Sequence, residues 1–193
     1  MSWLPREQRP ETDMPEQFTH EDLARMIVDA TKEVSTTMLG LELEAGTAYK
    51  IENEPSPKDG VVSLIGLAGT WVGTGSISCN SDFACLLSSQ LLMSEYSAVN
   101  EEVLDAVAEI TNMIIGNVKT LLEERVGPLG LSIPTVVYGL NFTTRSGGRN
   151  EWTVVPFHHD GKAMEIQLCL APNRDGHPAF RQGFDAPAQA GHR

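Results

Sequence analysis

Basic residues are scarce in this chain of 193 residues, which has 14 lysines and arginines against 26 aspartates and glutamates and a formal net charge of −12. Nucleic acids and anionic lipids bind cationic surfaces, so this balance argues against both as partners. No apolar run approaches the roughly 18 residues that a membrane-spanning helix needs. The N-terminal segment lacks the apolar stretch of a secretory signal, and we therefore expect a cytoplasmic protein.

Cysteine is also sparse. Cys79, Cys85 and Cys169 form no Cys-x-x-Cys pair, and their number is odd, which favours buried free thiols in a reducing compartment. The adjacent residues His158 and His159 make a poor metal site, because neighbouring strand residues point to opposite faces of a sheet. We therefore expect the chain itself to bind no metal and no other cofactor.

Most of the chain is predicted to form one domain, at residues 19–170. Residues 1–18 hold three prolines and many polar residues, and residues 171–193 lack periodicity, so we expect a flexible N-terminal segment and a loose C-terminal tail. N-capping residues at Thr19, Asn80 and Asn100 predict helices at about 19–39, 82–93 and 101–125. Six strands are expected at about 41–52, 61–68, 71–78, 135–142, 151–158 and 163–170.

The two long predicted helices carry the same spacing of residues at an offset of 76 positions. The two series are Asp29, Glu33, Thr36 and Gly40 in the first helix and Asp105, Glu109, Asn112 and Gly116 in the second. Each helix is followed by about three strands. We therefore predict an α+β fold of two α-β-β-β halves related by a pseudo-two-fold axis, with a mostly antiparallel six-stranded sheet and two long helices.

The second long helix presents an acid and an amide on one face. Because each helical residue advances by about 100°, the four residues of its series fall within roughly 60° of one another, with Glu102 at the edge. Asparagine is a poor helix former in mid-helix, so Asn112 favours a functional face, whereas an exposed glutamate often has no specific role. Aliphatic residues occupy the opposite side and fit a core: Val103, Val107, Ile110, Ile114, Val118 and Leu121.

The pattern Asp105-Ala-Val-Ala-Glu109-Ile-Thr-Asn112-Met-Ile-Ile-Gly116 resembles the surface-helix signature of the CheC/CheX/FliY phosphatases of bacterial chemotaxis. The resemblance covers most of residues 19–170 and includes the glycine-rich segment 66–78 and the stretch 131–139. One intact motif, in the second half, makes CheX the most similar member type. The resemblance implies a homodimeric phosphatase that hydrolyses the aspartyl phosphate of a CheY-like response regulator, with Mg²⁺ held by the receiver.

The same resemblance implies that Asn112 positions the attacking water and that Glu109 contacts the receiver's lysine. A neutral amide can accept a hydrogen bond from water and donate one to a phosphoryl oxygen without adding charge repulsion. Asp105 and Gly116 are expected at the partner contact, although a solvated acid and a helix-packing glycine are equal alternatives. Thr36 replaces the amide in the first helix, which predicts a degenerate face without phosphatase activity.

Two further functions are compatible with the sequence. A non-catalytic module would bind a receiver or a flagellar-switch component through the same helix, and a small-ligand sensor would use the acidic surface without any receiver.

Overall fold

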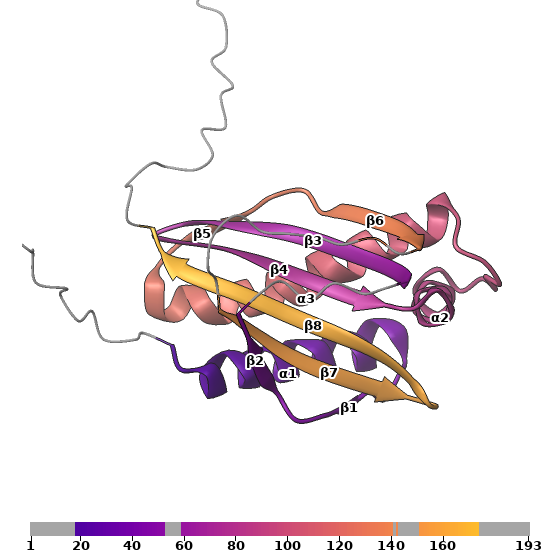
Figure 1. Cartoon of the computed structure of the whole chain (residues 1–193), viewed down its shortest axis with the longest axis horizontal. Coiled ribbons are helices and arrows are strands. Elements are labelled where there is room, and N and C mark those ends of the chain that lie inside the picture. The colour runs from indigo at the N-terminus through magenta and orange to yellow at the C-terminus, as the bar shows by residue number, and fades with distance from the viewer. Residues whose placement is uncertain (1–17, 53–58, 141, 143–150, 174–193) are drawn as a thin grey trace, which may run out of the picture.

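The computed structural model describes residues 18–52, 59–140, 142 and 151–173, so most of the expected N-terminal and C-terminal segments lie outside it. The helices of the described part are α1 (His20–Val34), α2 (Ser81–Leu92) and α3 (Glu101–Val126), and a π-helical turn, η1 (Ser35–Leu39), extends α1. In Figure 1, α1 and α3 lie side by side along one face of the sheet, and α2 lies at one end of the molecule. Among the described residues, no helix is both long and apolar enough to cross a membrane.

The helix boundaries follow from local capping. Thr19 Oγ1 accepts from the backbone N–H of Asp22 at 3.1 Å, while Asp22 Oδ2 accepts from the Thr19 N–H at 3.1 Å, which completes the capping box. Asn80 and Asn100 accept from backbone N–H groups in the first turns of α2 and α3 at 2.8 and 2.9 Å. Gly40 ends the first helical segment with a φ of 62°, a left-handed conformation that glycine adopts readily. The predicted helices are confirmed.

The described strands form one eight-stranded sheet in which every pairing is antiparallel. They are β1 (Glu44–Ala45), β2 (Tyr49–Ile51), β3 (Asp59–Gly69), β4 (Trp71–Cys79), β5 (Leu129–Leu131), β6 (Thr135–Leu140), β7 (Trp152–His159) and β8 (Lys162–Pro172). The prediction of a single strand at 41–52 is wrong, because β1 and β2 are separate short strands that both pair with β7. Strand β5 was not predicted; it and β6 both pair with β3. The sheet is therefore six positions wide, with each edge position divided between two short strands.

The order of the strands shows the internal repeat. Along the sheet the order is β1 and β2, then β7, β8, β4 and β3, then β5 and β6. The first half of the chain (β1 to β4) places its edge strands beside β7, and the second half (β5 to β8) places its edge strands beside β3. If each strand is replaced by its counterpart in the other half, the same order is obtained from the opposite edge of the sheet. The pseudo-two-fold relation lies between the central strands β4 and β8, where Ile77 pairs with Ile166.

The main core fills the layer between the sheet and the helices. The aliphatic side of α3 is buried there, with Ile110 and Val118 fully covered. Phe18 belongs to this core and meets Trp71 edge to face at 5.5 Å, so the last residue of the expected N-terminal segment packs with the domain. Strand β8 likewise continues two residues beyond the expected boundary at residue 170. The three cysteines are buried thiols, as predicted.

Candidate functional site

Helix α3 holds the acid and amide series on its exposed side. Its opposite side is buried against the sheet and α1, which fixes the rotation of the helix about its axis. Asp105, Glu109 and Asn112 are exposed, and Gly116 is partly exposed. No residue that the structure describes forms a hydrogen bond or an ion pair with the side chain of Asp105, Glu109 or Asn112. A carboxylate and a carboxamide one turn apart are therefore available to a second molecule.

Gly116 is not required for packing within the described chain. A Cβ atom placed on Gly116 would meet only the Cδ1 atom of Leu131, at 4.0 Å, which is an ordinary van der Waals contact. The helix-packing alternative for this glycine therefore has no support in the geometry. The missing side chain instead leaves the helix backbone open to close approach from outside.

Charge is distributed unevenly along α3. In its C-terminal part Lys119 and Glu123 form an ion pair at 2.8 Å, and Arg125 lies 3.5 Å from Asp22 of α1. A backbone N–H from Leu129 and the nearby Lys119 hold the pKa of Glu123 below its usual range. Within the described ranges, no cation pairs with the acids of the N-terminal part, which are Glu101, Glu102, Asp105 and Glu109. This part of the surface has a negative potential that favours a cationic contact.

The matching face of α1 has a different local structure. Asp29, Glu33 and Thr36 are exposed, but Thr36 lies in the π-helical turn η1 and its hydroxyl donates to the carbonyl of Lys32 at 2.8 Å. The Oε2 atom of Glu33 accepts a hydrogen bond from Nδ2 of Asn117 at 3.3 Å. Glu33 and Thr36 therefore form hydrogen bonds within the molecule, in contrast to Glu109 and Asn112.

Tyr96, in the segment between α2 and α3, extends the α3 surface in a way that sequence reasoning missed. Its hydroxyl donates to Oε2 of Glu102 at 3.0 Å. Partial desolvation, followed by the nearby Glu102 carboxylate, raises the pKa of this tyrosine above its usual value. Periodicity could not predict the contact, because Tyr96 lies outside the helix and only the path of the connecting segment brings it to Glu102.

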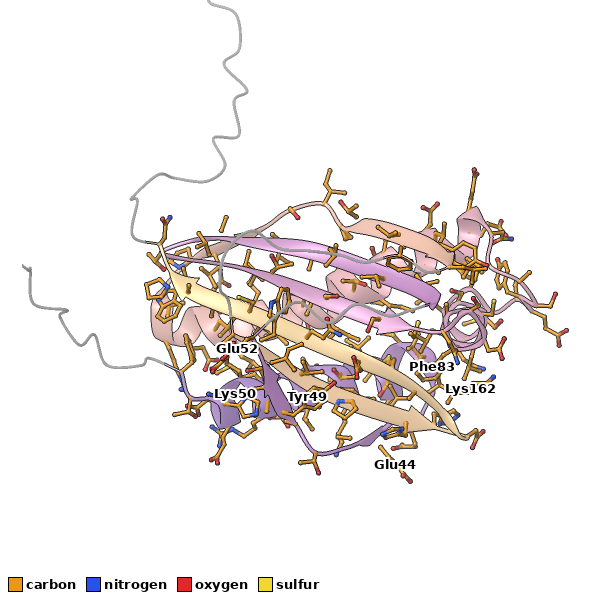
Figure 2. The ribbon with its side chains drawn as sticks, in the orientation of Figure 1. Glu44, Tyr49, Lys50, Glu52, Phe83 and Lys162 are labelled. Carbon is orange, nitrogen blue, oxygen red and sulfur yellow. The ribbon has the colours of Figure 1, made fainter. Side chains whose placement is uncertain are left out.

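A hollow of about 480 Å³ lies beside Tyr96 at the α2 end of the molecule. Its lining includes Cys85, whose pKa is raised by burial, and Lys162, which Figure 2 places at the same end as Phe83 of α2. Over the described ranges, no group of three or more histidine, cysteine, aspartate or glutamate residues is placed to hold a metal ion. The hollow is separate from the exposed series on α3.

The fold is that of CheC-like proteins. The structure of a CheC-like superfamily protein from Shewanella sp. PV-4 is 26% identical, with a TM-score of 0.68 over 77% of this chain and 97% of that one. Residues 61–158 match the family model described as chemotaxis phosphatase CheX. The chain belongs to this family, which confirms the resemblance found in the sequence.

Two similar proteins bear on the function of this site. The CheY-P phosphatase CheX of Thermotoga maritima is 26% identical over 127 residues, which cover 65% of this chain and 81% of the relative. The CheX in a CheX-CheY-BeF3-Mg²⁺ complex from Borrelia burgdorferi is 29% identical, with a TM-score of 0.67 over 77% of this chain and 97% of that one.

Proposed function

We propose that this protein hydrolyses the aspartyl phosphate of a CheY-type response regulator. The observation that carries the proposal is the exposure of Asn112 in the middle of a helix whose other side is buried. Asparagine has a low helix propensity, and the amide of Asn112 forms no hydrogen bond with the described residues. A contact with a second molecule explains its presence best. The family membership and the CheY-P phosphatase among the relatives support the same reaction.

The chemistry needs little more than a well-placed water molecule. An aspartyl phosphate is an activated acyl phosphate, and the receiver supplies Mg²⁺ and a lysine beside it. Asn112 enters this site, accepts a hydrogen bond from the attacking water and donates one to a phosphoryl oxygen, as the water-positioning glutamine does in GTPases. The amide is neutral, so it adds no repulsion to the charged phosphoryl group.

Glu109 anchors the docked receiver. It lies one turn before Asn112, about 4.5 Å along the helix axis, and its carboxylate accepts a charge-assisted hydrogen bond from the receiver's lysine. Asp105 continues the contact one turn further, and Gly116 allows the receiver's backbone to approach α3. By analogy with CheX, we further propose that the active form is a cytoplasmic homodimer.

The decisive experiment follows phosphate loss from a phosphorylated CheY-type receiver, for which the CheY of Borrelia burgdorferi is one available probe. We expect the protein to accelerate this loss and Asn112→Ala to reduce kcat by about 100-fold or more, the typical effect of removing one transition-state hydrogen-bond donor. Alanine is the better helix former, so the variant should be at least as stable as the parent. Gln90→Ala, which removes an exposed amide from α2, is the matched control and should leave kcat unchanged.

The binding-module alternative makes a different prediction for the same measurement. Phosphate loss at the receiver's own rate, together with binding of the receiver, would show a module that docks without catalysis. An Asn112→Ala variant with full activity would contradict the role given to this amide.

A further inference from the structure

Tyr96 is held in place by contacts with the core and with α2. Its ring is partly buried against the main core, and its backbone N–H donates to Oγ of Ser89 in α2 at 3.1 Å. Its hydroxyl donates to Oε2 of Glu102 at 3.0 Å. The carboxylate of Glu102 is therefore held by a residue that is itself held by α2 and the core, which lowers the entropy that Glu102 would lose on forming a contact.

Glu102 lies on the same line of α3 as Glu109. They are seven positions apart, which corresponds to a rotation of only about 20° and a displacement of roughly 10 Å along the helix axis. Asp105 lies between them, and Asn112 follows one turn after Glu109. The fixed carboxylate therefore marks the N-terminal end of the surface that faces a docked receiver.

The charge of Glu102 is not neutralised in the described part of the protein. Among the described residues its only hydrogen-bond partner is Tyr96, a neutral donor, and none of the described cations forms an ion pair with it. In contrast, two acids near the N-terminus of α1 and the C-terminus of α3 are neutralised by ion pairs. Asp22 and Glu123 each have a cation within 4 Å. A hydrogen bond from a neutral hydroxyl orients the carboxylate and leaves its negative charge for another molecule.

We propose that Tyr96 positions Glu102 to bind a lysine or arginine on the surface of the docked receiver, and that this contact selects among receivers. The proposal rests on the function proposed above. The cognate receiver would carry this basic side chain about 10 Å from the lysine that meets Glu109. Glu102 would be a specificity-determining residue and Tyr96 a positioning residue, and neither would take part in the chemical step.

The test measures kcat and KM for phosphate loss with the CheY of Borrelia burgdorferi and with other CheY-type receivers, at low and high ionic strength. For receivers with a basic residue at this position, Glu102→Gln should raise KM about two- to fivefold, which is the range of exposed ion pairs, with kcat unchanged. The salt dependence of KM should weaken in the same variant, because one ion pair across the interface is lost. Glu124→Gln, an exposed acid near the other end of α3, is the matched control and should leave KM unchanged.

Tyr96→Phe separates positioning from direct contact. This variant should raise KM less than Glu102→Gln does, and the double variant should be no worse than Glu102→Gln alone, because the tyrosine acts only through the glutamate. Additive effects, an effect on kcat alone, or a Glu102→Gln variant that matches Glu124→Gln would overturn the proposal. A parent protein that does not accelerate phosphate loss would contradict the proposed function itself, which is a separate outcome.

Discussion

Asn117 of α3 donates a hydrogen bond from its amide to the carboxylate of Glu33 in α1, across 3.3 Å. Glu33 is the residue that the internal repeat aligns with Glu109. The repeat has therefore diverged in structure as well as in sequence, because one glutamate bridges two helices while its counterpart faces outward. The side chain that would meet a receiver in one half helps to join the helices in the other.

The α1 face is expected to stay inactive even when its missing amide is supplied. Thr36 lies in a π-helical turn, where the wider helix changes the direction of the side chain relative to Glu33. Adding Thr36→Asn to the Asn112→Ala protein should therefore leave kcat for receiver dephosphorylation at the Asn112→Ala level. A marked recovery of kcat would show that only the identity of residue 36 had disabled this face.

Acid should destabilise the protein partly through Asp22. The backbone N–H and then the hydroxyl of Thr19 lower the pKa of Asp22, with smaller contributions from Arg125 and an opposing effect of desolvation. Because the folded pKa is below the unfolded value of about 3.9, this stabilisation is present above that pH and is lost as the pH falls through the folded pKa. In urea unfolding measured at several pH values, Asp22→Asn should be less stable than the parent near neutrality, and the difference should shrink in acid. A difference that does not change with pH would contradict this account.

The sequence predicted the parts of the fold that depend on neighbouring residues. Thr19 and Asn100 cap their helices through bonds to residues three positions away, so their roles could be identified from spacing alone. The edge strands depend on distant partners, and strands as short as β1 and β5 carry too few residues for an alternating pattern. The π-helical turn has no comparable sequence signal, since its residues fit an ordinary helix equally well.

The candidate site was predictable to a similar extent. Periodicity correctly indicated that Glu109 and Asn112 are on the exposed side of α3, and the chemical roles came from the family resemblance. Two features of Glu102 could be found only from the three-dimensional structure. These are its hydrogen bond from Tyr96 and the lack of a counter-charge beside it among the described residues. Sequence spacing predicts which side chains share a helix face, but the partners that come from other segments depend on the tertiary fold.

Gly75 is expected to be essential for packing α3 on the sheet. A Cβ atom at this position in β4 would lie 2.8 Å from Cδ1 of Ile115, which is fully buried in the core. Gly75→Ala should therefore lower the free energy of unfolding in urea by about 1–3 kcal/mol, the usual cost of overpacking a core. Gly130→Ala in β5 is the control, because its Cβ would meet the carbonyl oxygen of Ala68 at an ordinary 3.5 Å. Equal stability of the two variants would argue against a close helix-sheet contact at Gly75.

Gly116 should respond to substitution in the opposite way. The described chain leaves room for a Cβ atom there, and alanine is more favourable than glycine in a helix by about 1 kcal/mol, so Gly116→Ala should raise the thermal unfolding temperature. If a receiver's backbone approaches α3 at this point, the added methyl group should nevertheless raise KM for the phosphorylated receiver. Thermal unfolding and steady-state kinetics of this one variant therefore separate the two roles considered for the glycine. A destabilised protein would restore the packing role, and a stabilised protein with unchanged KM would remove Gly116 from the docking surface.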